Sequence, residues 1–136
     1  MITFKQKEYS NADVEVFHSF LSELNGFVVK CKILHWAASK NDIHTRLDEF
    51  HEILGDYQDA LAEGFMGILG KIEASEIGCV LPDTNEPGEF IRLVESRTSA
   101  FHDLIPESVE FKGILSDNES FIQNIQKYKY LFSLCQ

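Results

Sequence analysis

The sequence lacks the features that would place it in several large classes of protein. No stretch approaches the roughly 18 apolar residues of a membrane-spanning helix, and no run alternates apolar and polar residues as a half-buried strand does. Its first residues lack the apolar run of a secretory signal peptide, so we expect a cytoplasmic protein. Three cysteines without a CxxC spacing do not form a disulfide framework, and they agree with a reducing compartment.

Basic residues are also scarce. The chain has 12 Lys and Arg against 22 Asp and Glu, a formal net charge of −10. This balance, with only Lys5 and Lys7 near the start, argues against DNA binding because duplex binding depends on neutralising phosphates. An acidic surface is instead compatible with collecting cations. With 136 residues and eleven Phe, the chain is expected to form a single folded domain over residues 1–136.

Helical periodicity divides the chain into four segments. Apolar residues recur at three- and four-residue steps over about residues 11–38, 42–71 and 87–105, and a capping box at 116–119 predicts the start of a last helix. We expect an N-terminal arm over 1–10 and a loop over 73–86. Gly26 is expected to weaken the first helix by about 1 kcal/mol. Four amphipathic helices predict an all-α fold, an antiparallel four-helix bundle.

The second helix carries a band of ligand-type side chains opposite its apolar stripe. At about 100° per residue, His44, Asp48, Asp59 and Glu63 fall in a band about 100° wide, about 145° from that stripe. His44 and Glu63 lie about 28 Å apart along the axis, so one helix cannot close a metal site across them. Two copies packed antiparallel would bring the His44 end of one to the Glu63 end of the other. A two-fold dimer would then hold two equivalent sites.

The residue types in this band suit a metal. Imidazoles and carboxylates bind iron, manganese or zinc, and carboxylates able to bridge favour a pair of ions. His51, at the edge of the band, is an additional candidate ligand. The other interpretation is a solvated outer face with no ligand role. Val29, Ile33 and Trp36 form a second apolar stripe on the first helix, which is either a dimer contact beside the site or part of a wide core face.

The segment from His35 to Glu63 resembles the Dps proteins, which are ferritin-like mini-ferritins, and most closely the short Dps-like proteins that phages encode. The matching pattern is His35-Trp36, then His44-x-x-x-Asp48, then Asp59-x-x-x-Glu63. The phage proteins share the nine-residue step between the two histidines. For such a protein the expected location is the host cytoplasm.

The resemblance implies a ferritin-like bundle with a di-iron site between two subunits. In the family, residues matching His35, His44 and Asp48 come from one subunit, and those matching Asp59 and Glu63 come from its two-fold partner. Trp36 would form a wall of the site. The implied activity is that of a ferroxidase, which oxidises Fe(II) with peroxide or oxygen and stores the product in a twelve-subunit shell. The 73–86 loop is too short for the extra helix of Dps, which leaves the shell open to question.

Two other functions remain compatible with the sequence. A helical interaction or accessory protein, encoded by a phage for example, could keep the ferritin-like fold without any turnover. A helical dimer could also hold iron, zinc or manganese as a structural metal without oxidising it. Whether the protein is an enzyme is therefore open on sequence grounds.

Overall fold

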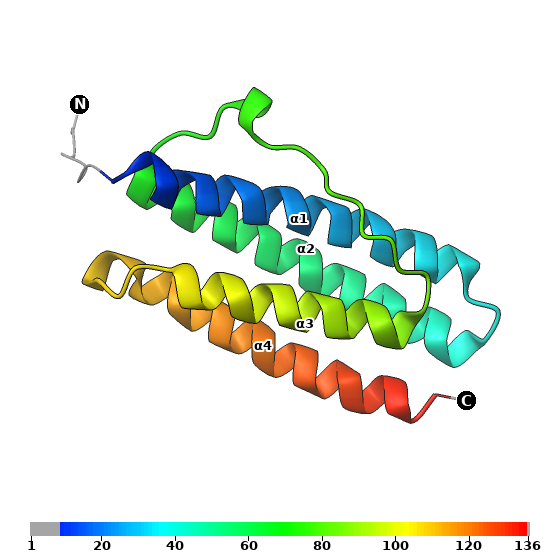
Figure 1. Ribbon diagram of the computed structural model, residues 1–136. Coiled ribbons are helices and arrows are strands. Elements are labelled where there is room, and N and C mark those ends of the chain that lie inside the picture. The colour runs from blue at the N-terminus through cyan, green and yellow to red at the C-terminus, as the bar shows by residue number, and fades with distance from the viewer. Residues whose placement is uncertain (1–8, 136) are drawn as a thin grey trace.

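The computed structural model describes residues 9–135, which form a bundle of four α-helices (Figure 1). The elements are α1 (Asn11–Ala37), α2 (Asn41–Leu69), η1 (Ala74–Glu76), α3 (Pro87–Leu104), η2 (Val109–Phe111) and α4 (Lys112–Ser133), of which η1 and η2 are short 3-10 turns. The described residues contain no strand, so the predicted all-α fold is confirmed. In the same part of the chain, no helix is both long enough and apolar enough to cross a membrane.

Neighbouring helices of the bundle run antiparallel. α1 and α2 form one hairpin and α3 and α4 a second, while α2 packs against α4 and α1 against α3. The link from α2 to α3, residues 70–86, is a long crossover that passes along the outside of α1 (Figure 1). This crossover joins helices that lie diagonally across the bundle, so α2 and α3 run in the same direction.

Local signals explain three of the helix ends. The Ser10 side chain accepts a hydrogen bond from the first turn of α1 and caps it, one residue before the predicted start. α2 ends where Gly70 adopts a φ of 98°, a left-handed conformation that favours glycine. The Glu86 side chain caps α3, and Pro87 occupies its first position. Of the predicted N-terminal arm, residues 1–8 lie outside the described residues.

The start of the last helix differs from the prediction. Residues 116–119 lie inside α4, which begins earlier at Lys112, so they are not its capping box. The chain enters α4 directly from η2, and the buried side chains of Phe111 and Ile114 pack this first turn into the core. Asn118, within the predicted box, is itself fully buried. Burial of apolar side chains therefore outweighs the local capping signal here.

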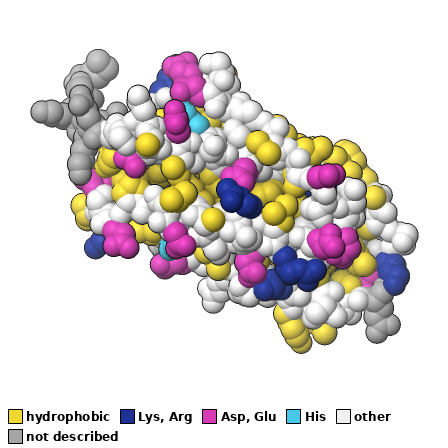
Figure 2. Space-filling view, viewed as in Figure 1, with side chains coloured by type: hydrophobic (Ala, Val, Ile, Leu, Met, Phe, Trp, Pro, Cys, Tyr) yellow, Lys and Arg dark blue, Asp and Glu magenta, His cyan; other side chains and the backbone are white. Residues whose placement is uncertain are grey.

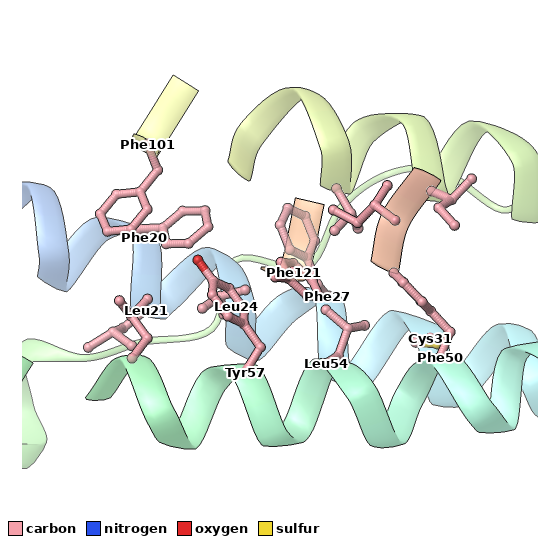
Figure 3. Close-up of a cluster of buried hydrophobic side chains, with 14 of the residues drawn as sticks. Phe20, Leu21, Leu24, Phe27, Cys31, Phe50, Leu54, Tyr57, Phe101 and Phe121 are labelled. Carbon is pink, nitrogen blue, oxygen red and sulfur yellow. The ribbon is translucent and has the colours of Figure 1, made fainter. Parts of the chain in front are cut away.

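Aromatic side chains join the two hairpins in the interior (Figure 3). Phe20 of α1 stacks on Phe101 of α3, and Tyr57 of α2 stacks on Phe121 of α4, each with 4.0 Å between ring centroids. Among the described residues, the buried set includes no His, Asp or Glu. The imidazole and carboxylate side chains therefore lie outside this core, on the surfaces of the helices.

Candidate metal centre

The turn between α1 and α2 places two histidine rings face to face. His35 lies in the last turn of α1 and His44 in the first turn of α2, separated by the short connection 38–40. Their rings stack with centroids 3.8 Å apart and planes inclined by 24°, and the His35 side chain is only 12% exposed. One turn away, the buried Cys31 thiol donates to the carbonyl oxygen of Leu47 at 3.4 Å. The packing of the hairpin therefore sets the geometry of the pair.

Reciprocal hydrogen bonds define which nitrogens of the histidine pair are available. Nδ1 of His35 lies 2.8 Å from the carbonyl oxygen of His44, and Nδ1 of His44 lies 2.8 Å from the carbonyl oxygen of His35. A carbonyl oxygen can only accept, so each Nδ1 donates its proton and the neutral ring keeps its lone pair on Nε2. Histidines that bind metals are usually oriented by such a bond to a carbonyl. The pair thus presents two Nε2 atoms held in place by the backbone.

Asp48, one turn after His44, places a carboxylate beside this pair. Its Oδ1 lies 3.8 Å from Nε2 of His35 and 3.9 Å from Nζ of Lys32, and its side chain is 61% exposed. Two ligands that each bind a metal at about 2.0–2.2 Å can be no more than about 4.4 Å apart, so the His35–Asp48 spacing fits a shared ion. The structure therefore brings together the three residues that the resemblance assigns to one subunit.

His51 and Lys32 also lie at this end of the hairpin, close to Asp48. His51, half-buried about one turn beyond Asp48, has a pKa lowered from its usual value of 6.5, mainly by burial and then by the charge of Lys32, while Asp48 acts in the opposite direction. The neutral form of His51 is therefore favoured near pH 7. Sequence reasoning missed Lys32, although its position one turn before His35 could have indicated it.

The two remaining predicted ligands do not join this group. Asp59 and Glu63 are exposed in the second half of α2, opposite its buried stripe, as the periodicity predicts. Over residues 9–135, no group of three or more His, Cys, Asp and Glu side chains of one chain is placed to hold a metal ion. The structure thus divides the five predicted ligands between the two ends of α2: His35, His44 and Asp48 at one end, Asp59 and Glu63 towards the other.

Beside the histidine pair, α1 carries an uncovered apolar surface, here called the outer stripe. It consists of Val29, Ile33 and Trp36, which are 43%, 36% and 68% exposed. The interpretation of these residues as part of a wide core face is therefore wrong, because the core of one chain leaves them in solvent. Trp36 directly follows His35, but its role as a wall of the site stays a prediction.

The crossover covers the first half of this side of α1. The backbone N–H of Val80 donates to the carbonyl oxygen of Ser22 at 2.9 Å, and that of Gly78 donates to Oγ of Ser22 at 2.9 Å. A Cβ atom added to Gly26 would lie 1.7 Å from the carbonyl oxygen of Val80. Gly26, which the sequence predicts only as a weak point of the helix, therefore permits the close approach of two backbone segments.

No family model, no curated protein and no solved structure matches the chain. The resemblance to Dps consequently depends on the spacing of the motif residues alone. What the geometry itself provides is a helical bundle that presents two oriented imidazoles and a carboxylate at one end of its first hairpin.

Proposed function

We propose that the protein is a Dps-like metal-binding protein that binds and oxidises Fe(II) at a di-iron site shared between two chains. The observation that carries the proposal is the reciprocal hydrogen bonding of His35 and His44, because it orients both imidazoles with their Nε2 lone pairs free, and Nε2 of His35 lies 3.8 Å from Oδ1 of Asp48. The connectivity supports it as well. A single long crossover between the two hairpins is typical of ferritin-like bundles, whereas up-and-down bundles have short loops only.

Each chain would supply three ligands to one site and two to the other. His35 and His44 would contribute neutral nitrogen ligands and Asp48 a carboxylate, while Asp59 and Glu63 of a second copy would complete the set. This mixture of imidazole and carboxylate suits iron, with zinc and manganese as alternatives. The carbonyl bonds to each Nδ1 would keep the imidazoles from turning away when an ion arrives.

Fe(II) would be the substrate of this site. Two Fe(II) ions each give up one electron, and together with two protons they reduce one molecule of hydrogen peroxide to two molecules of water; oxygen is the alternative oxidant. The carboxylates would stabilise the higher charge of the Fe(III) product. The exposure of Asp48, Asp59 and Glu63 gives ions access from solvent. Storage of Fe(III) in a twelve-subunit shell belongs to the same proposal, and requires contacts beyond this site.

Anaerobic Fe(II) titration followed by addition of peroxide tests the proposal. We expect the wild-type protein to bind Fe(II) and oxidise it, which the absorbance of the ferric product reports. Asp48→Ala and Glu63→Ala should each lower the oxidation rate by about 100-fold or more, since each removes a ligand and even an outer-shell partner is worth about 10–100-fold. Glu119→Ala, which removes an exposed acid from α4, is the matched control and should retain the wild-type rate. A wild-type protein that neither binds nor oxidises Fe(II) contradicts the proposal.

The exposed outer stripe favours one alternative, a non-enzymatic interaction protein with the same bundle. Metal analysis of the purified protein separates the two. Iron or zinc at about one or two ions per chain argues against a metal-free interaction protein. A dimer with a structural metal would instead show thermal stability that depends on the metal and no oxidation of Fe(II).

A further inference from the structure

We propose that association of two copies is coupled to the metal: the chain is monomeric without a divalent cation and dimerises when the cation binds. The surface concerned is the outer face, defined as the exposed side of α1 and α2 that carries the outer stripe and the acids of α2. The inference rests on the proposed function because it uses the same two-chain site. It adds that the metal controls assembly as well as serving as substrate.

The positions of the ligands determine how two copies would meet. If His44 of one copy faces Glu63 of the other, Asp48 faces Asp59, and the two-fold axis passes α2 just before Gly55. A Cβ atom added at Gly55 would meet nothing within 4 Å, so the surface there is open. Two α2 helices can therefore approach closely at the axis, which is what shared ligands at both ends require.

The same register brings acidic side chains of the two copies close together. Five acids of α2 lie on the outer face and are exposed: Asp48, Glu52, Asp56, Asp59 and Glu63. Lys32 is the basic side chain that the structure places among them, 3.9 Å from Asp48. The whole chain carries a net charge of −10, and Figure 2 shows acidic side chains spread over the visible face of the molecule with fewer basic ones. Carboxylates of one copy would thus face carboxylates of the other, which disfavours association in the absence of a cation.

A pair of divalent ions reverses this balance. Each shared site would collect Asp48 from one copy and Asp59 and Glu63 from the other, so three negative charges would surround two Fe(II) ions with four positive charges. The ions are then the largest local charges and convert repulsion into attraction. Because the ligands of each site come from both copies, binding of the ions and association of the chains become one event.

The outer stripe supplies the apolar part of the contact. It is exposed at the histidine end of α1, and Met66, 38% exposed, lies at the opposite end of α2. In the register above, Trp36 of one copy comes towards Met66 of the other. These few side chains favour association without forming a large hydrophobic interface, so the charge of the outer face decides whether the dimer forms.

Sedimentation analysis of the full chain, first in chelator and then with Mn(II), tests the coupling without any oxidation step. We expect a monomer in chelator and a dimer with Mn(II), with association strengthened by about 100-fold or more, the upper part of the usual coupling between two binding events. In chelator, about 1 M salt should promote the dimer, since it shortens the screening length to about 3 Å. Equilibrium dialysis measures Mn(II) binding in the same samples.

Three variants separate the contributions of the acidic residues and of the apolar contact to dimer formation. Asp48→Asn with Asp59→Asn removes the facing charges and two ligands, so it should dimerise more readily than wild type in chelator and lose the response to Mn(II). Trp36→Glu should weaken the dimer formed with Mn(II) by at least about 10-fold, because a negative charge replaces an apolar side chain in the contact. Tyr130→Glu, a matched change at an exposed residue of α4, should leave it unchanged. Circular dichroism confirms that each variant keeps its helices.

The outcomes distinguish this inference from the proposed function. A dimer of equal stability in chelator and in Mn(II), with Mn(II) bound, overturns the coupling and leaves the shared site standing. A double Asn variant that stays as monomeric as wild type in chelator overturns the role of the facing carboxylates. A monomer that binds Mn(II) overturns both the coupling and the two-chain site. Absence of both Mn(II) binding and dimerisation rejects the proposed function, and the coupling with it.

Discussion

The two halves of one side of α1 make an instructive contrast. In the first half, around Ser22 and Gly26, the chain's own crossover lies directly on the helix and hydrogen-bonds to it. In the second half, the outer stripe from Val29 to Trp36 is apolar and uncovered. One half is therefore covered by the chain itself, and the other is left uncovered by residues 9–135.

The crossover is held against α1 by polar anchors and a small residue, whereas the side chains of the outer stripe are all apolar. The Asn25 side chain donates to the carbonyl oxygen of Gly78 at 2.7 Å, and Nζ of the buried Lys30 donates to Oδ1 of Asn85 at 3.0 Å. These contacts tie both parts of the crossover to α1. A backbone needs such partners when it lies against a helix, whereas an interface between separate molecules is better served by apolar side chains.

Gly26→Ala, in the covered half, should destabilise the protein more than any of the other substitutions. The new Cβ would lie 1.7 Å from the carbonyl oxygen of Val80, and because both are backbone positions the crossover must move. We expect a loss of about 2–3 kcal/mol in the free energy of unfolding, typical of overpacking in a tight contact. Urea denaturation measures it.

Gly67→Ala is the matched control for that substitution. An added Cβ at Gly67 meets nothing within 4 Å, and the residue lies within α2. Replacing this helical glycine should stabilise the protein by up to about 1 kcal/mol. Equal effects of the two substitutions would show that the crossover does not press on α1 at Gly26.

Asn85→Ala should have the next largest effect. It leaves the ammonium group of the buried Lys30 without its partner, and we expect a loss of about 1–2 kcal/mol. Lys30→Met keeps the aliphatic stem and removes the group that needs a partner, so it should cost less than Asn85→Ala. Thermal and urea unfolding of both variants and of the double mutant give the coupling between the two residues. Additive effects of the two substitutions would count against the hydrogen bond.

Trp36→Ser, in the uncovered half, should have the smallest effect of these substitutions on the free energy of unfolding. The Trp36 side chain is 68% exposed, and substitutions at such positions usually change stability by no more than about 0.5 kcal/mol. The measurement belongs in chelator at low protein concentration, where a dimer cannot contribute. A loss comparable to that of Gly26→Ala would mean that the chain itself covers the outer stripe.

Several features of the fold follow from local sequence patterns. The four helices and the 73–86 loop were predictable because apolar spacing records which side of each helix is buried. The same spacing predicted that Asp48, Asp59 and Glu63 would face solvent, which they do. The start of α4 was not predictable, because Phe111 and Ile114 extend the helix by packing against distant residues.

The candidate site divides in the same way. The sequence alone determined which residue types stand at which helical spacing, and therefore that the four candidate ligands of the second helix cannot meet along that helix. Only the tertiary structure decided that each Nδ1 of the histidine pair bonds to the other residue's carbonyl oxygen, and that the crossover covers half of α1 and leaves the outer stripe exposed. The physical reason is that periodicity reports the burial of each helix separately. The direction of a ring nitrogen and the path of a long connection depend on contacts between segments far apart in the chain.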